Sequence, residues 1–192
     1  MPDQLFITDV GPRDGLQSQK TPVDTAGKRA LINALWVAGV RGIEATSFVS
    51  SKAVPQMAET GAGEVVIADT IGAAAPRDVD ALFEPLVQVI PAERLGIHLH
   101  DTRGMALANA WAAIGHGIRR FDSSIGGLGG CPFAPGAAGN LATEDLVLMA
   151  QQCGFNTGID LPALMAAVDL AGRLVGYEVG GRSARWLRRP AT

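Results

Sequence analysis

Two histidines lie two residues apart in the stretch LGIHLHDT, residues 95–102. If this stretch is a β-strand, His98 and His100 share one face and Ile97 and Leu99 share the other, because successive side chains alternate. The two apolar residues indicate a face that packs against helices, so both imidazoles would point toward a barrel interior or the end of a sheet. Such a pair could bind a metal or act as a base, although two polar residues on a half-solvated strand would give the same alternation.

Further polar residues stand where other strands are expected to end. Asp14 offers a carboxylate beside the two imidazoles, and Asn140 could add an amide oxygen. This nitrogen and oxygen set contains no thiolate, so it suits a hard cation such as Mg²⁺ or Mn²⁺, while zinc stays possible on ligand type alone. The remaining polar residues at expected strand ends are Arg13, Glu44, Asp69 and Asp122.

A glycine-rich loop, IGGLGGCPFAPGAAGN, surrounds Cys131. A dinucleotide-binding fingerprint that starts at Gly127 would need a glycine where Pro132 stands, so that interpretation is weak. We interpret the loop as a mobile lid that brings a thiol to a reaction centre, with an inert loop cysteine as the alternative. The second cysteine, Cys153, lies near an expected helix end and has no comparable setting.

The composition indicates one ordinary globular domain. The chain has 192 residues, a formal charge of −3 and 47% hydrophobic residues, which gives no basic field for nucleic acid. Neither a leader nor a long apolar run is evident, so we expect a cytoplasmic protein without membrane contact. Two cysteines make no disulfide framework in a reducing compartment. The basic end, residues 180–192, is expected to be a flexible tail.

Strands alternate with helices along the chain. We expect strands over residues 5–10, 42–48, 64–70, 95–101 and 120–125, and helices over residues 25–38, 78–90, 105–116, 143–152 and 161–175. This alternation predicts an α/β fold with a parallel sheet, either doubly wound or closed into a (β/α) barrel. In both architectures binding groups gather at the carboxyl ends of the strands, where the polar residues above are expected.

Several motifs together resemble the 3-hydroxy-3-methylglutaryl-CoA lyase family. They are VGPRDGLQ, IEATSFVS, VPQM, DTIG, HLHDT and GLGGCPFAPGAAGNLATEDLV, and the resemblance covers the chain from Leu5 to about Val175. It implies a (β/α)₈ barrel that binds Mg²⁺ or Mn²⁺ at the carboxyl ends of its strands. It also implies an acyl-CoA thioester substrate, cleaved at a carbon–carbon bond to acetoacetate and acetyl-CoA.

The resemblance also implies a role for each candidate residue. Arg13 would contact the thioester carbonyl, and Cys131 would transfer a proton from the lid. Glu44 and Asp69 would be further polar members of the site, and His98 would both bind the metal and help to move protons. The implied metal ligands are Asp14, His98, His100 and Asn140, the same set that the ligand chemistry suggests.

The chain is too short for the whole barrel. Eight βα units need about 250 residues, and only five strands are evident. Family members carry three more units between VPQM and DTIG, so on the order of 100 residues are missing, with the apparent join near residues 57–63. The remaining strands would be one, two, six, seven and eight of the barrel. Because strand eight lies beside strand one, they would form one continuous arc that keeps every implied ligand.

Such an arc has an exposed inner face and two unpaired edges, which invite association. We therefore expect an incomplete barrel, an open curved sheet that forms a homo-oligomer or is poorly stable. Three functions stay open: the lyase reaction itself, a non-catalytic remnant that folds only with a partner, and a related reaction on another acyl-CoA or a 2-oxo acid.

Overall fold

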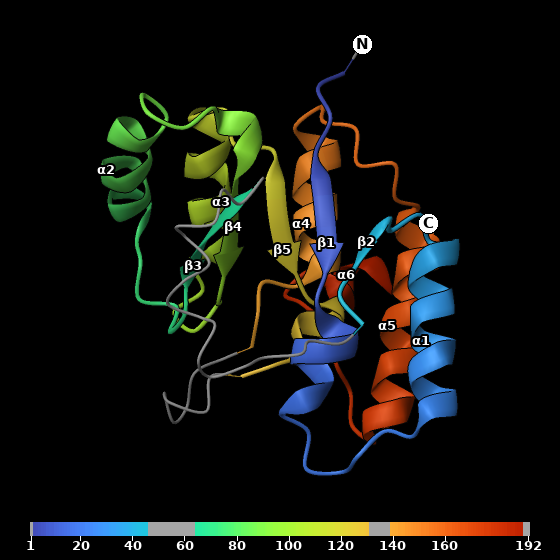
Figure 1. Cartoon of the computed structure of the whole chain (residues 1–192). Coiled ribbons are helices and arrows are strands. Elements are labelled where there is room, and N and C mark those ends of the chain that lie inside the picture. The colour runs from blue at the N-terminus through green and yellow to red at the C-terminus, as the bar shows by residue number, and fades with distance from the viewer. Residues whose placement is uncertain (1, 46–63, 131–138, 190–192) are drawn as a thin grey trace.

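Five strands build a single parallel sheet in the computed structural model, which describes residues 2–45, 64–130 and 139–189 (Figure 1). They are β1 (Phe6–Asp9), β2 (Gly42–Ile43), β3 (Val65–Asp69), β4 (Leu95–Leu99) and β5 (Arg120–Ser123). Their order is β2-β1-β5-β4-β3, and every neighbouring pair is parallel. The predicted arc is confirmed: the last strand lies beside the first, and within the described residues the sheet does not close.

Six α-helices accompany the sheet in the described part of the chain. They are α1 (Thr25–Val37), α2 (Pro76–Leu86), α3 (Ala106–Gly115), α4 (Thr143–Gln152), α5 (Leu161–Val175) and α6 (Ala184–Leu187). The bounds of α4 and α5 match the prediction, whereas α2 begins earlier than expected because Pro76 is tolerated in a first turn. None of these helices combines the length and hydrophobicity that a bilayer crossing requires.

Aspartate side chains fix where two of the longer helices begin. Asp24 accepts a hydrogen bond of 2.7 Å from the Gly27 amide at the start of α1. Asp160 accepts one of 2.7 Å from the Ala163 amide at the start of α5. Each carboxylate satisfies a backbone N–H that has no partner inside the helix, which explains why both helices start at these residues.

The register of the sheet separates an apolar face from a polar face. Ile7, Phe121 and Ile97 are aligned across β1, β5 and β4, and all three are buried. One residue further along, Asp122 of β5 is aligned with His98 of β4. The apolar row packs under the helices as the alternation in residues 95–102 predicts, so the histidines lie on the opposite face.

The hydrophobic core lies between the sheet and the helices, with α1 against α5 and α2 against α3. Its large fully buried side chains include Leu31 and Leu35 of α1, Phe83 of α2 and Phe121 of β5. Burial of each such side chain contributes roughly 1.5–3 kcal/mol to folding. The core therefore holds the strands from one side only.

The edge strand β3 is less protected than the centre of the sheet. Val65 and Val66 are 36% and 47% exposed, and Leu82 on the adjacent helix α2 is 45% exposed. Among the described residues, only β4 pairs with β3. The predicted unpaired edge at this strand is thus present.

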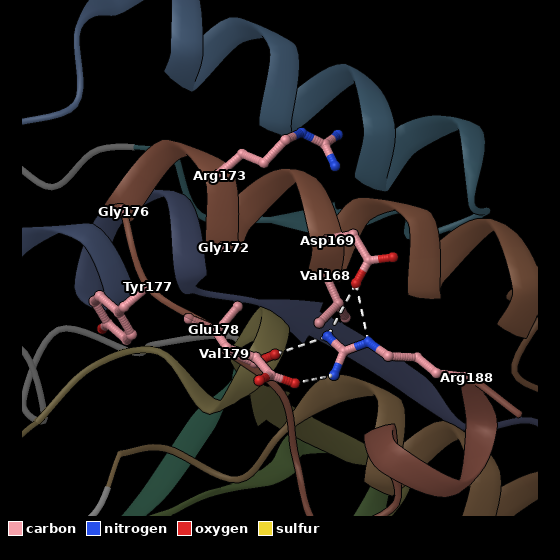
Figure 2. A pocket seen from close by; sticks show the side chains of 9 residues that line it. All are labelled: Val168, Asp169, Gly172, Arg173, Gly176, Tyr177, Glu178, Val179 and Arg188. Carbon is pink, nitrogen blue, oxygen red and sulfur yellow. Dashed lines mark hydrogen bonds and ion pairs between the residues drawn. The ribbon is translucent and has the colours of Figure 1, made fainter.

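The flexibility expected of the basic end stays a prediction, but as far as residue 189 this segment makes defined contacts with the rest of the fold. Arg188 forms ion pairs of 2.9 Å with Asp169 and 3.1 Å with Glu178, and it donates to the carbonyl oxygen of Val179 at 2.9 Å (Figure 2). Ala184 of α6 is buried. A guanidinium group with three acceptors anchors this segment to α5, a long-range contact that local charge density does not reveal.

Candidate metal centre

Asp14, His98 and His100 converge at the carboxyl end of the sheet. One ligand atom from each residue can be chosen so that all three atoms lie within 4.8 Å of one another. The two imidazole rings project from β4 with centroids 5.1 Å apart. Asp14 comes from the short turn that follows β1, so two strands that are separated by β5 supply the cluster.

Asn140 lies against the same cluster. An isolated bridge pairs it with His100, and the neighbouring Leu141 amide donates to the Leu99 carbonyl at 2.9 Å. The Asn140 Nδ2 donates to Asp14 Oδ2 at 2.8 Å and to the Leu128 carbonyl at 3.0 Å. Among the residues that the structure describes, its buried Oδ1 has no hydrogen-bond partner.

These four residues fit a hard divalent cation. A buried acceptor without a partner is costly unless a ligand satisfies it, and an amide oxygen is a usual ligand of such ions. Two imidazoles and a carboxylate lie beside that oxygen. The sequence-predicted ligand set is therefore gathered in one place, and its donor types suit Mg²⁺ or Mn²⁺.

Hydrogen bonds orient both histidines. The Nδ1 atom of His100 lies 3.0 Å from the Asp69 carbonyl oxygen, so Nδ1 carries the proton and Nε2 keeps its lone pair. Burial, and then the neighbouring His98, lower the pKa of His100, which favours the neutral ligand form. On β5, Asp122 Oδ2 lies 3.4 Å from Nδ1 of His98 and orients that ring in turn.

Arg13 stands next to the cluster and is held by two carboxylates. Its Nη2 donates to Glu44 Oε2 at 2.7 Å, and its Nη1 donates to Asp14 Oδ1 at 3.1 Å. Burial alone would lower the pKa of Arg13, but Glu44 and Asp14 raise it overall. The guanidinium group is thus a permanent, oriented positive charge at the strand ends.

The turn that carries Arg13 and Asp14 is a single π-helical turn, Gly11–Gly15. The amides of Arg13 and Asp14 both donate to the carbonyl oxygen of Val10, at 3.1 Å and 2.7 Å. A Cβ atom on Gly11 would lie 2.7 Å from Ile125 Cγ2. Only glycine allows the turn to pack this closely, which explains the residue that opens the motif GPRDG.

Asp69 contributes to the site through its main chain. Its carboxylate accepts hydrogen bonds from the amides of Ala73 and Ala74, at 2.9 Å and 3.1 Å, in the turn before α2. Its carbonyl oxygen contacts His100. A catalytic role of the Asp69 side chain stays a prediction, and Cys131 lies outside the described residues, so its role as a lid thiol also stays one.

The sequence interpretation missed a buried acid directly behind the site. Asp9, the last residue of β1, is fully buried and accepts a hydrogen bond of 2.7 Å from Thr143 Oγ1. Burial raises the pKa of Asp9 to about 7, although the hydrogen bonds from Thr143 and Gly11 act in the opposite direction. The sequence signal for it is an acidic residue at the end of an apolar strand, just before a turn that begins with glycine.

A parallel βα sheet with polar residues at its carboxyl ends is the arrangement of (β/α)-barrel enzymes. Residues 51–171 match the family model described as HMGL-like. The chain belongs to the HMGL-like family, and the resemblance seen in its motifs is confirmed.

Curated relatives are similar to the chain over most of its length. It is 41% identical to hydroxymethylglutaryl-CoA lyase of Pseudomonas mevalonii over 178 residues, which cover 86% of this chain and 59% of that protein. It is 48% identical to (R)-citramalyl-CoA lyase of Chloroflexus aurantiacus over 133 residues, 67% of this chain and 42% of that protein. It is 30% identical to mitochondrial hydroxymethylglutaryl-CoA lyase of Arabidopsis thaliana over 299 residues, 100% of this chain and 64% of that protein.

The chain therefore spans less than two thirds of the length of these relatives. The Arabidopsis alignment is longer than the 192 residues of this chain, so that relative carries residues without a counterpart here. The expected join near residues 57–63 lies outside the described residues and stays a prediction.

Solved structures of the same family share the fold. The HMG-CoA lyase of Bacillus subtilis superposes with a TM-score of 0.89 at 28% identity, covering 98% of this chain and 99% of that chain. An HMG-CoA lyase of Acinetobacter baumannii, in complex with coenzyme A and 3-methylmalate, gives 0.86 at 29% identity, covering 99% and 98%. The five-stranded sheet is thus an incomplete barrel of this fold.

Proposed function

We propose that this chain is a divalent-metal-dependent carbon–carbon lyase that cleaves 3-hydroxy-3-methylglutaryl-CoA to acetoacetate and acetyl-CoA. The observation that carries the proposal is the cluster of Asp14, His98 and His100 beside the unpartnered Oδ1 of Asn140. The family and the names of its relatives support the reaction class.

The metal ligands in this proposal are Asp14, His98, His100 and Asn140. A bound Mg²⁺ or Mn²⁺ ion would lower the pKa of the substrate's tertiary hydroxyl group and offset the charge that develops on its oxygen. His98 would help to remove that hydroxyl proton, with its ring oriented by Asp122.

Arg13 would hold the thioester oxygen while negative charge develops on it. Its guanidinium group is already oriented by Glu44, so little reorganisation is needed at that moment. In other enzymes the loss of one such donor costs roughly 3 kcal/mol of transition-state stabilisation. The thiol of Cys131, on the predicted lid, would then donate a proton to the carbanion of acetyl-CoA, which completes the formation of acetyl-CoA.

A different acyl-CoA is the second candidate substrate. The identity to citramalyl-CoA lyase exceeds the identity to the Pseudomonas mevalonii lyase over a shorter alignment, which favours a test of both thioesters. The metal cluster would serve either substrate, because both candidates release acetyl-CoA from a tertiary alcohol. The acyl group must therefore be identified by product assay.

A non-catalytic remnant is the third candidate, favoured by the short chain and the open β3 edge. The same edge supports a homo-oligomer, in which a second copy covers Val65 and Val66. The expected cytoplasmic location stays a prediction.

The proposal is tested by release of acetyl-CoA from purified protein with Mg²⁺ or Mn²⁺, across several acyl-CoA thioesters. The variant His100→Ala should abolish metal binding and turnover. The control is His116→Ala, because His116 lies next to the end of α3 and contacts Asp80 at 2.9 Å, away from the cluster. Turnover of citramalyl-CoA alone would identify the second substrate, and unchanged Mn²⁺ affinity in His100→Ala would refute the ligand set.

A further inference from the structure

Asp9 is a buried carboxylate that the proposed reaction does not use. Its Oδ1 accepts a hydrogen bond of 2.8 Å from the Gly11 amide, and its Oδ2 accepts one of 2.7 Å from Thr143 Oγ1. The Thr143 hydroxyl also lies 2.8 Å from Ser123 Oγ. All four groups are buried, so solvent cannot replace any of these contacts.

Three chain segments meet at this residue. Gly11 opens the turn with Arg13 and Asp14, and Thr143 follows Asn140 by three residues. The carbonyl oxygen of Asp9 itself accepts a hydrogen bond of 2.9 Å from the Glu44 amide. Asp9 therefore joins three segments through its side chain and main chain. One carries Arg13 and Asp14, one carries Glu44, and one carries Asn140.

The Asp9 carboxylate packs tightly against the turn that begins at Gly11. A Cβ atom on Gly11 would lie only 2.8 Å from Asp9 Oδ1, so the carboxylate and the turn are in close contact. Movement of the turn would break the Gly11 hydrogen bond and change the distance between Asp14 and Asn140. A rigid support of this kind is what a metal site needs, because small displacements of a ligand weaken binding.

We propose that Asp9 is a positioning residue: it fixes Arg13 and Asp14 through Gly11, and Asn140 through Thr143, in the geometry that metal binding and the lyase reaction require. This inference rests on the proposed function. Asp9 belongs to none of the groups that would touch metal or substrate, so its removal acts through the positions of other side chains.

The experiment compares Asp9→Ala, Asp9→Asn and Thr143→Val with wild type in Mn²⁺ titrations, thermal unfolding and thioester cleavage. Asp9→Ala should weaken Mn²⁺ binding by roughly 10–100-fold, the range seen when supporting contacts of metal ligands are lost. Asp9→Asn should recover much of that affinity, because its Oδ1 can accept from Gly11 while Thr143 donates to Ser123. Thr143→Val removes only the second contact and should fall between them.

The control for a general loss of stability is Leu35→Ala, a cavity in α1 at a fully buried residue without a polar side chain. It should lower the unfolding temperature but keep the Mn²⁺ affinity of wild type. The role of Asp9 would be overturned if Asp9→Ala bound Mn²⁺ as tightly as wild type. It would also be overturned if Leu35→Ala, compared at the same loss of unfolding temperature, lost as much Mn²⁺ affinity as Asp9→Ala. If wild type binds Mn²⁺ but cleaves no thioester, the proposed function fails while the affinities still decide on Asp9; if wild type does not bind Mn²⁺, both fail.

Discussion

The side-chain amide of Asn140 donates a 2.8 Å hydrogen bond to Asp14, although the two residues are 126 positions apart in the chain. The bond joins the turn after β1 to the segment that follows β5. β1 and β5, the first and last strands along the chain, are neighbours in the sheet, so this bond ties the two ends of the chain's strand sequence together at the proposed metal site.

Replacement of Asn140 by Ala should therefore weaken metal binding. The change removes the proposed ligand atom Oδ1 and the hydrogen bond to Asp14, so we expect a loss of Mn²⁺ affinity at least as large as the roughly 10–100-fold that loss of a supporting contact costs, measured by calorimetric titration. Asn109→Ala is a matched control, since Asn109 on α3 is buried and its Oδ1 also lacks a partner among the described residues, but its Nδ2 donates to the Ala74 carbonyl in the turn before α2. Equal losses in both variants would contradict the assignment of Asn140.

Arg13→Lys should separate catalysis from metal binding. A lysine keeps the charge but cannot contact Glu44 and Asp14 with the planar fork of the guanidinium group. We expect kcat to fall by roughly 100-fold, while the Mn²⁺ affinity changes little. Steady-state kinetics and a Mn²⁺ titration check this. The control is Arg119→Lys, because Arg119 also forms an ion pair, with Asp3. A kcat equal to that of wild type would exclude Arg13 from the reaction.

The raised pKa of Asp9 predicts how stability depends on pH. Its pKa rises from an ordinary value of 3.8 to about 7, chiefly through burial, with the nearby Glu144 as a smaller cause. Between these two pH values the folded state binds more protons than the unfolded state, so stability falls as the pH rises. Above about pH 7 this contribution levels off.

Asp9→Asn carries no titrating group at this position, so the comparison isolates the effect. The free energy of unfolding of wild type relative to Asp9→Asn should fall by roughly 4 kcal/mol between pH 4 and pH 8. Urea unfolding at several pH values measures it. A difference that is constant over this range would show that the pKa of Asp9 is not shifted by folding, and one that grows with pH would show that folding lowers it; either would contradict the raised pKa.

The open edge of β3 predicts self-association. Val66 on this edge strand is 47% exposed, and a lysine there should prevent another strand from pairing with it. Val66→Lys should therefore shift the protein toward the monomer in sedimentation velocity experiments. Val89→Lys is the control, because Val89 is 76% exposed but lies outside the strands. An unchanged sedimentation coefficient in Val66→Lys would mean that this edge is not an interface.

Much of the fold follows from the alternation of short apolar runs with helical periodicity. The strand order was predicted from the family resemblance, because in the complete barrel of the family the last strand lies beside the first. The segment 42–48 was expected to form a longer strand, whereas within the described residues β2 covers only Gly42–Ile43. Edge strands receive hydrogen bonds from one side, so sequence preference alone does not set their length.

The part of the candidate site that could be predicted from the sequence consists of residues close together in the chain, such as His98 and His100. The contact of Asp9 with Thr143 joins residues 134 positions apart, so no local pattern contains it. The Asp69 carboxylate has contacts that its motif does not reveal: it accepts hydrogen bonds from backbone amides in the following turn, while its predicted role in the site stays a prediction.

The most direct test of the account is thermal unfolding of the purified chain with and without millimolar Mn²⁺. A cation that binds only the folded state at about 100 times its Kd adds roughly 2.7 kcal/mol of stability. For a chain of this size that corresponds to an increase in Tm of roughly 5–10 °C, lost in His100→Ala. A cooperative transition with this shift is the predicted result. A Tm that Mn²⁺ leaves unchanged, or unfolding without cooperativity, would contradict the proposed metal site.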